Sequence, residues 1–480
     1  MKLLPTAPIL SQEILISKIQ SAKQSGFAMR AISAVVILIL VISPVPLLLA
    51  FSSHNSGDSV EKRITQNIVI SSLMDHGPIT IVGDSGFEAQ GWPGGGNETS
   101  PYIIEGLSIV SNVSCIRIED TTVYFVIKNC ILSGNNTETS QRGTSIGLFN
   151  VTHGIIENCT MYGQSMAFES AYSEHTIFRR NTVHDFNGYV IIGDYLTNCS
   201  FEDNTIYNLD DDVFIMNDIE NCTFSGNLVY DIQEPVLFGS NFKDCTISSN
   251  TIMNVDGGWG IVIGDVDTCI ITDNMIFNAT GGIGVGTVNN SVVARNVIEH
   301  IRIRAGISIS RGGNCNVEEN TVSESKYQSS AITLSDVIDS SFYHNRVFNN
   351  TYDGLVLRNV DRCNLTYNEI HENGRVGIRV DENCTMNRFF GNVLFDNADS
   401  NAMDDGTSNQ WDDGISIGNT WGDYNGKGVY VVPGSAGSVD HYPKGTTSSS
   451  NGTDYLVLVY VGIIGGVVIV PLLLIYVKKR

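Results

Sequence analysis

The chain has 480 residues, with 51 acidic against 28 basic side chains and a formal net charge of −23 at pH 7. Such a charge excludes nucleic acid and anionic membrane surfaces as binding partners, because both would be repelled. It suits an exposed, soluble surface or one that gathers cations.

Three segments are predicted before the main body of the chain. Residues 1–30 form a basic lead, either cytoplasmic or part of a signal sequence, and residues 31–51 are an apolar stretch. A start at Met29 gives this stretch the form of a conventional signal peptide, whereas a start at Met1 makes it a signal anchor behind a long lead. Either alternative places residues 52–455 outside the cell, beginning with a linker over 52–77.

A repeat of about 23 residues fills residues 78–395 and is marked by one asparagine per repeat. The series runs through Asn158, Asn181, Asn204, Asn227, Asn250, Asn274, Asn296, Asn320, Asn345, Asn368 and Asn392, with Asn129 one longer coil earlier. Around each asparagine, short runs of alternating apolar residues are separated by turns rich in Gly, Asn, Asp and Ser, which indicates strands. A fixed period of this length is typical of a solenoid.

We therefore predict an all-β fold, a right-handed parallel β-helix of about twelve rungs, since crossovers between parallel strands are right-handed. Stacked in register, the asparagine amides should bond to one another along the shaft. Six of the ten cysteines lie five residues before a ladder asparagine: Cys199, Cys222, Cys245, Cys269, Cys315 and Cys363. Buried thiols are the main interpretation, with a soft-metal ribbon and scattered disulfides as alternatives.

An acidic turn follows the ladder asparagine on consecutive rungs, beginning near His184 and Asp185. Because rungs stack, six carboxylates are expected to converge on one edge: Asp210, Asp211, Asp212, Asp231, Glu234 and Asp256. Stacked carboxylates repel unless a cation relieves them, so these six are candidate ligands for Ca²⁺. Paired carboxylates also serve glycosidases as acid and base, which makes Asp210, Asp212 and Asp231 candidate catalytic residues. A solvated turn without chemistry is the third interpretation.

The strand after this turn is expected to present an apolar stripe of four outward residues: Ile191, Phe214, Leu237 and Val262. The same row continues through Gly284, Ser308, Thr333, Val356 and Arg379. Exposed apolar patches mark contact sites, and sugars favour them, so the four residues are candidate ligand-binding positions. The alternative is that a flanking loop covers the stripe.

A cap over residues 396–443 and a linker over 444–455 follow the repeats. The cap holds a cluster of acids that fails the EF-hand template: Asp399, Asp404, Asp405, Asp412 and Asp413. His441 is expected to pack in the cap. Residues 456–477 carry no charge over 22 positions, which predicts a transmembrane helix, and the basic residues 478–480 place the C-terminus in the cytoplasm.

Thirteen Asn-x-Ser/Thr sequons between residues 52 and 455 agree with an exported glycoprotein. They lie at Asn97, Asn112, Asn135, Asn150, Asn158, Asn198, Asn221, Asn278, Asn289, Asn349, Asn364, Asn383 and Asn451. The predicted location is the cell membrane, with an extracellular ectodomain.

The most specific sequence motifs lie at the two ends of the repeat region. They are Gly91–Asn97 and Pro101–Gly106 at the N-terminal end, and Asn409–Gly414 and Gly418–Tyr424 at the C-terminal end. In these the chain resembles the right-handed parallel β-helix proteins exported by archaea. Those proteins are related to the periplasmic copper-binding β-helix family within the pectate-lyase-like superfamily. The resemblance covers residues 77–443 and implies the fold. It carries over no catalytic signature and no copper ligand set.

Two classes of function follow. The first is a membrane-anchored surface protein, without enzymatic activity, that binds glycans or partner cells. The second is a polysaccharide lyase or hydrolase that uses the acidic edge. Lyases on related folds need an outward arginine near metal-binding carboxylates, and Arg358 and Arg379 lie many rungs away from Asp210–Asp212. This separation favours the first class.

Overall fold

The computed structural model describes residues 73–134, 143–186, 188–326 and 329–446. The predicted segments at 1–30, 31–51 and 456–477 lie outside these ranges. Within them, no helix has the length and apolar character that crossing a membrane requires.

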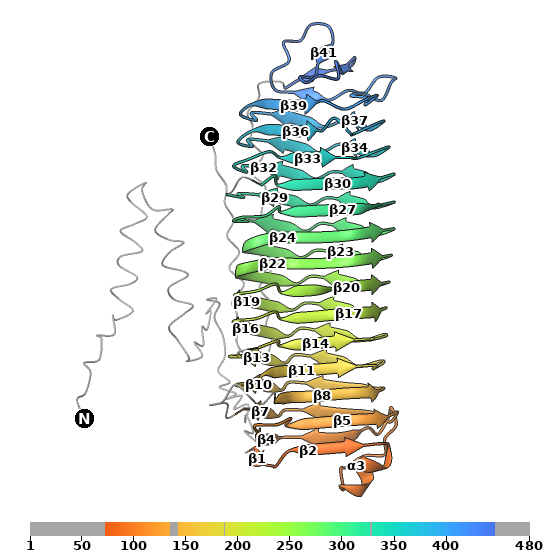
Figure 1. Ribbon diagram of the computed structural model, residues 1–480, viewed down its shortest axis with the longest axis vertical. Helices are drawn as coiled ribbons and strands as arrows, with labels where there is room; N and C mark the ends of the chain where they lie inside the picture. The colour runs from red at the N-terminus through yellow and green to blue at the C-terminus, as the bar shows by residue number, and fades with distance from the viewer. Residues whose placement is uncertain (1–72, 135–142, 187, 327–328, 447–480) are drawn as a thin grey trace, which may run out of the picture. The chain divides into compact units, whose positions relative to one another are not determined.

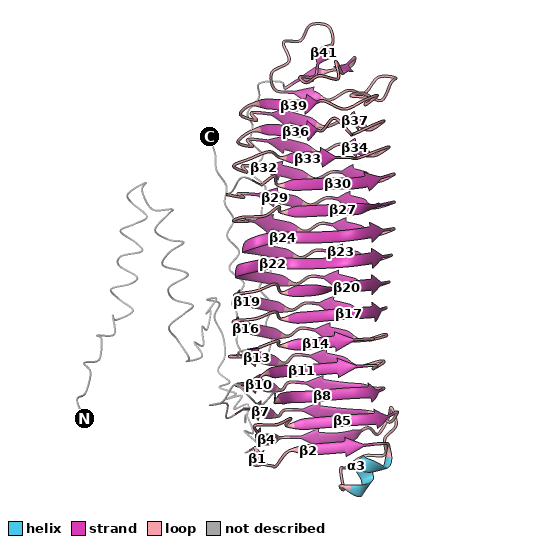
Figure 2. Ribbon diagram, viewed as in Figure 1, coloured by secondary structure: helices cyan, strands magenta, loops and turns pink. Residues whose placement is uncertain are grey.

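The described residues form a right-handed parallel β-helix of about 14 turns, two more than the predicted dozen (Figure 1). Turns stack in chain order from β1 (Met74–Asp75) at one end to the other end, where β41 (Tyr430–Val431) pairs antiparallel with β42 (Val439–Asp440). Strands make up nearly all the regular structure, and one short helix, α3 (Ser85–Ala89), stands at the N-terminal end (Figure 2). The predicted fold class is therefore confirmed.

Each turn contributes strands to three parallel ladders, which we call sheets 1, 2 and 3. Sheet 1 holds β1 (Met74–Asp75), β4 (Leu107–Val110), β7 (Ile131–Ser133), β10 (Thr160–Tyr162), β13 (Thr182–His184), β16 (Thr205–Leu209), β19 (Leu228–Ile232), β26 (Val297–Glu299), β29 (Thr321–Ser323), β32 (Arg346–Phe348), β35 (Glu369–His371), β38 (Val393–Phe395), β40 (Thr420–Trp421) and β43 (Lys444–Gly445).

Sheet 2 holds β2 (Ile79–Val82), β5 (Ile116–Thr121), β8 (Thr144–Val151), β11 (Met166–Ala171), β14 (Ile191–Asp194), β17 (Phe214–Glu220), β20 (Leu237–Lys243), β27 (Ile307–Gly313), β30 (Ile332–Ile338), β33 (Leu355–Arg358), β36 (Val376–Val380) and β39 (Ser400–Asp404). Two long strands, β22 (Thr251–Asp267) and β24 (Met275–Asn289), run through both sheets 1 and 2.

Sheet 3 holds β3 (Tyr102–Glu105), β6 (Phe125–Lys128), β9 (Gly154–Glu157), β12 (Ile177–Arg179), β15 (Ser200–Glu202), β18 (Thr223–Ser225), β21 (Thr246–Ser248), β23 (Ile270–Thr272), β25 (Val292–Ala294), β28 (Asn316–Glu318), β31 (Ser341–Tyr343), β34 (Asn364–Thr366) and β37 (Arg388–Phe390). The alternating side chains of all three sheets fill one continuous core.

The predicted asparagine ladder runs along this core from Asn181 to Asn419. Each amide nitrogen donates to the amide oxygen one turn on, as from Asn204 Nδ2 to Asn227 Oδ1 at 3.0 Å. The same oxygen also accepts the Asn204 backbone N–H, at 3.1 Å. Each repeat thus closes hydrogen bonds that buried backbone groups require.

The predicted ladder is wrong in its first two members, Asn129 and Asn158. Cys159 occupies the ladder position, because its backbone N–H donates to Asn181 Oδ1 at 2.9 Å. Asn158 stands one residue earlier, where the chain turns with φ 54°. Asparagine is favoured at both positions for different reasons, amide pairing and a left-handed turn, so the sequence could not separate them.

All ten cysteines are buried and none forms a disulfide. Cys199, Cys222, Cys245 and Cys269 stack on four consecutive turns, and the Cys245 N–H donates to Cys269 Sγ at 3.3 Å. Burial raises the pKa of the Cys363 thiol to about 12, which keeps this thiol protonated. The interpretation as buried small hydrophobes is confirmed.

Candidate functional site: a groove on sheet 2

The apolar stripe lies one residue away from its predicted position. Ile191, Phe214 and Leu237 point into the core and are 0%, 3% and 3% exposed, so their prediction as outward residues is wrong. Val262 does face outward, paired with Phe238, while Leu237 pairs with the inward Ile261. The turn between sheets 1 and 2 changes length from one repeat to the next, which shifted the count.

The true outward row of sheet 2 is Ile192, Ile215, Phe238, Val262, Gly284 and Ser308. A second outward row, two residues further along each strand, holds Asn217, Ser240, Gly264, Gly286 and Ser310. Bulky apolar residues therefore give way to glycine and serine partway along one face.

This change in side-chain size creates a groove of about 430 Å³ over β17, β20, β22, β24 and β27, near the middle of the shaft (Figure 1). Five turns at ~4.8 Å give it a length of about 19 Å between the outer strands. A volume of this order is typical of sites for small ligands. The groove is lined by apolar side chains with amide and hydroxyl groups among them.

Two aromatic side chains dominate the groove. Phe238 is 47% exposed. Trp259 lies across the next strand, where a β-carbon on Gly281 would stand 2.5 Å from the indole ring. A β-carbon on Gly284 would lie 3.4 Å from the same ring. Glycine at these positions therefore lets the indole lie close against β24.

Arginines stand at the rim of the groove. The Arg304 guanidinium carbon is 5.8 Å from the centre of the Trp259 ring, within the range of a cation–π contact. Arg311 Nη2 lies 3.8 Å from the place of a β-carbon on Gly286. Arg302 is bound to Asp256, with Nη1 to Oδ1 at 2.7 Å.

The predicted metal ligands do not assemble into a site. In the described ranges, no group of three or more His, Cys, Asp or Glu side chains is arranged to hold a metal. Asp256 forms an ion pair with Arg302. Asp231 belongs to an exposed column in which asparagines alternate with aspartates, and its Oδ1 accepts Asn254 Nδ2 at 2.8 Å. The neutral Asn208 separates Asp231 from Asp185 in this column, so these two carboxylates do not lie on adjacent turns.

Three carboxylates of the acidic turn nevertheless affect one another. Burial, together with the charges of Asp211 and Glu234, raises the pKa of the Asp212 carboxyl to about 6. Asp211 Oδ1 accepts the Asp212 backbone N–H at 2.9 Å. Asp210 stands exposed at the start of the turn. The predicted acid and base, Asp210, Asp212 and Asp231, are not joined by any hydrogen bond among themselves.

A second carboxylate pair was missed in the sequence. Glu169 lies in the first outward row of sheet 2, and Asp194 lies in the second row one turn on. Burial first and the Asp194 charge second raise the pKa of Glu169, against the opposing effect of Arg117. Asp194 Oδ1 accepts Asn217 Nδ2 at 3.1 Å, which connects the pair to the groove. The sequence would have revealed this pair only if the outward-facing positions of sheet 2 had been assigned correctly.

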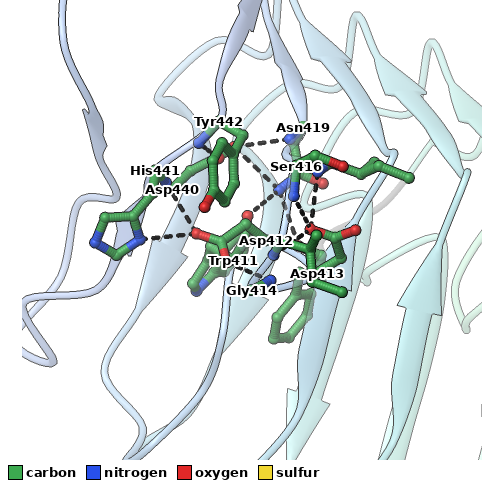
Figure 3. Close-up of polar contacts among 12 residues, drawn as sticks. Trp411, Asp412, Asp413, Gly414, Ser416, Asn419, Asp440, His441 and Tyr442 are labelled. Carbon is green, nitrogen blue, oxygen red and sulfur yellow. Dashed lines mark hydrogen bonds and ion pairs between the residues drawn. The ribbon is translucent and has the colours of Figure 1, made fainter.

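The cap acids Asp412 and Asp413 accept hydrogen bonds from backbone N–H groups (Figure 3), and Asp404 Oδ2 accepts Trp411 Nε1 at 2.8 Å. Asp413 Oδ1 accepts three backbone N–H groups, from Ile415, Ser416 and Ile417, and these bonds lower the pKa of Asp413. Asp412 Oδ2 accepts His441 Nδ1 at 2.8 Å. His441 is bound to the cap through this contact, but its side chain is 64% exposed, so the prediction that it packs in the cap is wrong.

The two distant arginines are also engaged. Arg379 forms an ion pair with the buried Asp353, through Nε to Oδ2 at 3.1 Å and Nη2 to Oδ1 at 3.2 Å. Arg358 lies 3.9 Å from Asp381. Neither is near the acidic turn, in agreement with the sequence.

Fold and sequence together define a right-handed parallel β-helix protein with a groove on one sheet. A family model described as right handed beta helix region matches residues 114–259. A second model, described as periplasmic copper-binding protein (NosD), matches residues 239–426. The predicted resemblance to right-handed parallel β-helix proteins, the periplasmic copper-binding family among them, is therefore confirmed. Copper binding is not carried over, because the described residues hold no fitting group of ligands.

Solved structures with the same kind of fold are distant. A mutant of the periplasmic alginate epimerase AlgG is 14% identical, with a TM-score of 0.44, over 61% of this chain and 78% of its own. The A-module of an Azotobacter vinelandii mannuronan C-5 epimerase is 11% identical, with a TM-score of 0.35, over 70% and 90%. The catalytic domain of a GH87 α-1,3-glucanase is 10% identical, with a TM-score of 0.31, over 63% and 61%. A search of curated proteins gives no match.

Proposed function

We propose that this protein is a glycan-binding scaffold whose ligand lies in the groove on sheet 2. The observation that carries the proposal is the pair of aromatic residues, Phe238 and Trp259, beside amide and hydroxyl groups in an open groove. Sugar rings present apolar faces and polar edges, so they need both kinds of contact. Partly exposed aromatic side chains are also the usual anchors of binding surfaces.

A long column of stacked rings on sheet 1 does not offer the same surface. Tyr162, His184, Tyr207 and Tyr230 stack on one another along sheet 1, with ring centres 5.0 to 5.2 Å apart. Their faces are therefore covered by the neighbouring rings, and their edges are left for solvent. Phe238 and Trp259 line an open groove instead.

A glycan array probed with the full-length protein tests the proposal. Phe238→Ala and Trp259→Ala should each weaken binding about tenfold, a loss of about 1.4 kcal/mol. Phe277→Ala is the matched control, since Phe277 is 38% exposed on sheet 1, away from the groove. Binding that survives both groove substitutions unchanged would show that the ligand lies elsewhere.

We also propose that the protein is anchored in the cell membrane. The apolar segment 456–477 and the basic tail 478–480 support an anchor in the cell membrane with the β-helix outside. An antibody tag after Thr446 should be labelled on intact cells, and a tag after Arg480 only after permeabilisation. The opposite labelling would refute this orientation.

An enzymatic alternative rests on Glu169 and Asp194. A carboxyl group with a raised pKa beside a second carboxylate is the arrangement of a glycosidase acid and base. Asp194 adjoins the groove through its hydrogen bond to Asn217, and Glu169 lies one turn further from the groove. If this alternative holds, the protein releases new reducing ends from a bound polysaccharide, and Glu169→Gln and Asp194→Asn each abolish the release while binding persists. Ca²⁺ dependence of either function stays a prediction, tested by adding a chelator.

A further inference from the structure

Two arginines at the groove differ from the other arginines in the described ranges. The guanidinium groups of Arg304 and Arg311 have no carboxylate within ion-pair distance and donate no hydrogen bond, whereas the Arg304 backbone N–H donates to the Thr280 carbonyl oxygen at 2.8 Å. Each other arginine has such a carboxylate or, for Arg388, donates to the Asp413 carbonyl oxygen at 3.1 Å. In a chain of net charge −23, two unpaired cations beside one groove form a local exception.

The two side chains stand at opposite edges of the groove. Arg304 precedes β27 and contacts the Trp259 ring at the edge where sheet 2 begins. Arg311 lies near the other end of β27, beside Gly286. Between them the floor is made of small residues, Gly284, Ser308 and Ser310 among them. Both arginines are exposed, so their donors are free to reach a ligand in the groove.

We propose that the groove takes an acidic oligosaccharide, whose sugars bear carboxylate or sulfate groups, and that Arg304 and Arg311 bind those groups. The inference rests on the proposed glycan-binding function and specifies its ligand. A guanidinium matches a carboxylate or sulfate with two parallel hydrogen bonds. Trp259 and Phe238 contact the sugar rings between the charges. The net charge of −23 on the chain disfavours the denser phosphate charge of a nucleic acid.

Matched pairs of oligosaccharides test the proposal with the full-length protein. Hexamers of galacturonate and of mannuronate are each compared with the carboxyl-reduced neutral hexamer, and a sulfated galactan hexamer with its desulfated form. We expect at least one acidic member to bind ten times more tightly than its neutral partner, with an affinity that falls as salt rises. The pairs distinguish carboxylate from sulfate.

The double variant Arg304→Gln/Arg311→Gln should bind both members of the pair equally. The control is Arg180→Gln/Arg295→Gln, which removes the same charge from two arginines already paired with Asp203 and Asp273; it should keep the tenfold difference. Thermal unfolding of each variant verifies the fold, and the two single Arg→Gln variants should each lose part of the difference.

Three results overturn the inference in distinguishable ways. Equal binding of acidic and neutral partners by the wild-type protein refutes acid recognition and leaves glycan binding intact. A tenfold difference that persists in the Arg304→Gln/Arg311→Gln variant moves the acidic contact to other residues. Failure of all six hexamers, or tighter binding of a single-stranded DNA hexamer, refutes the proposed function together with the inference.

Discussion

The asparagine side chain explains how single residues hold this β-helix together. Its amide has a donor on one atom and an acceptor on the other, so identical side chains can pair along the shaft without limit. Asn250 illustrates this, because its Nδ2 donates to Asn274 Oδ1 at 2.9 Å and its Oδ1 accepts from Asn227 Nδ2 at 2.9 Å. Serine and cysteine fill the parallel column before sheet 3, where the backbone N–H needs only an acceptor.

Asn250→Ala should lower the melting temperature of the protein. The substitution removes the acceptor of the Asn227 backbone N–H and leaves the Phe224 carbonyl without the Asn250 Nδ2 donor. Buried groups left without a partner cost about 1–3 kcal/mol. Asn316→Ala is the matched control, since Asn316 is exposed on β28. Equal melting temperatures for the two variants would refute the structural role of the ladder.

At the scale of elements, the strands could be predicted from the sequence and their connections could not. The inward and outward alternation of each strand repeats from turn to turn, so the fold class follows from it. The connection between sheet 1 and sheet 2, which follows each ladder asparagine, differs in length from one repeat to the next. Phe238 follows Asn227 by 11 residues, Val262 follows Asn250 by 12, and Gly284 follows Asn274 by 10. A shift of one residue exchanges the inward and outward faces.

The same variation hid the candidate site. Trp259 lies where the pairing of β22 with β24 shifts between Val255 and Trp259, so no periodic pattern indicates the direction of its ring. The unpaired state of Arg304 and Arg311 depends on distances to carboxylates in other turns. Sequence reasoning found the correct sheet, but three of the four predicted stripe residues, Ile191, Phe214 and Leu237, lie in its core.

The acidic turn between sheets 1 and 2 should make stability depend on pH through Asp212. The pKa of Asp212 is raised from 3.8 to about 6, so the native protein holds this proton more tightly than the unfolded chain. Its contribution to stability is complete below pH 4 and is lost as the pH rises through 6. Asp212→Asn should remove this loss and raise the melting temperature at pH 7 relative to wild type.

Melting curves between pH 4 and pH 7 measure this effect. Asp210→Asn serves as the control because Asp210 is exposed in the same turn. If the melting temperatures of the wild-type protein and of Asp212→Asn change with pH in the same way over this range, the Asp212 carboxyl does not titrate as proposed.

At the scale of the whole molecule, a solenoid needs ends that stop its hydrogen bonding. Two shorter asparagine columns accompany the main ladder near the C-terminal end, one through Asn387 and Asn409 and one through Asn350, Asn373, Asn397 and Asn401. All three columns finish at an aspartate. Asn419 Nδ2 and backbone N–H reach Asp440 Oδ2, Asn409 Nδ2 reaches Asp404 Oδ1 at 3.0 Å, and Asn401 Nδ2 reaches Asp423 Oδ1 at 2.8 Å. A carboxylate accepts hydrogen bonds and has no donor that needs a further turn. Acceptor-only residues therefore terminate the ladders.

Asp440→Ala should loosen the C-terminal end and leave the middle of the shaft intact. The substitution removes the acceptor of the Asn419 N–H at 2.7 Å and of Trp421 Nε1 at 2.9 Å, both in buried positions. In repeat proteins each turn is stabilised by its neighbours, so damage at one end spreads only gradually. We expect faster amide hydrogen exchange in β38, β40 and β43, and unchanged protection in β14 and β17.

The control for this variant is Glu382→Ala, which removes an exposed carboxylate from a nearby turn and should leave exchange unchanged everywhere. A uniform rise in exchange from β14 to β43 in Asp440→Ala would mean that the β-helix unfolds as one unit. In that case Asp440 would hold the entire fold, and termination of a ladder would be the wrong description of its role.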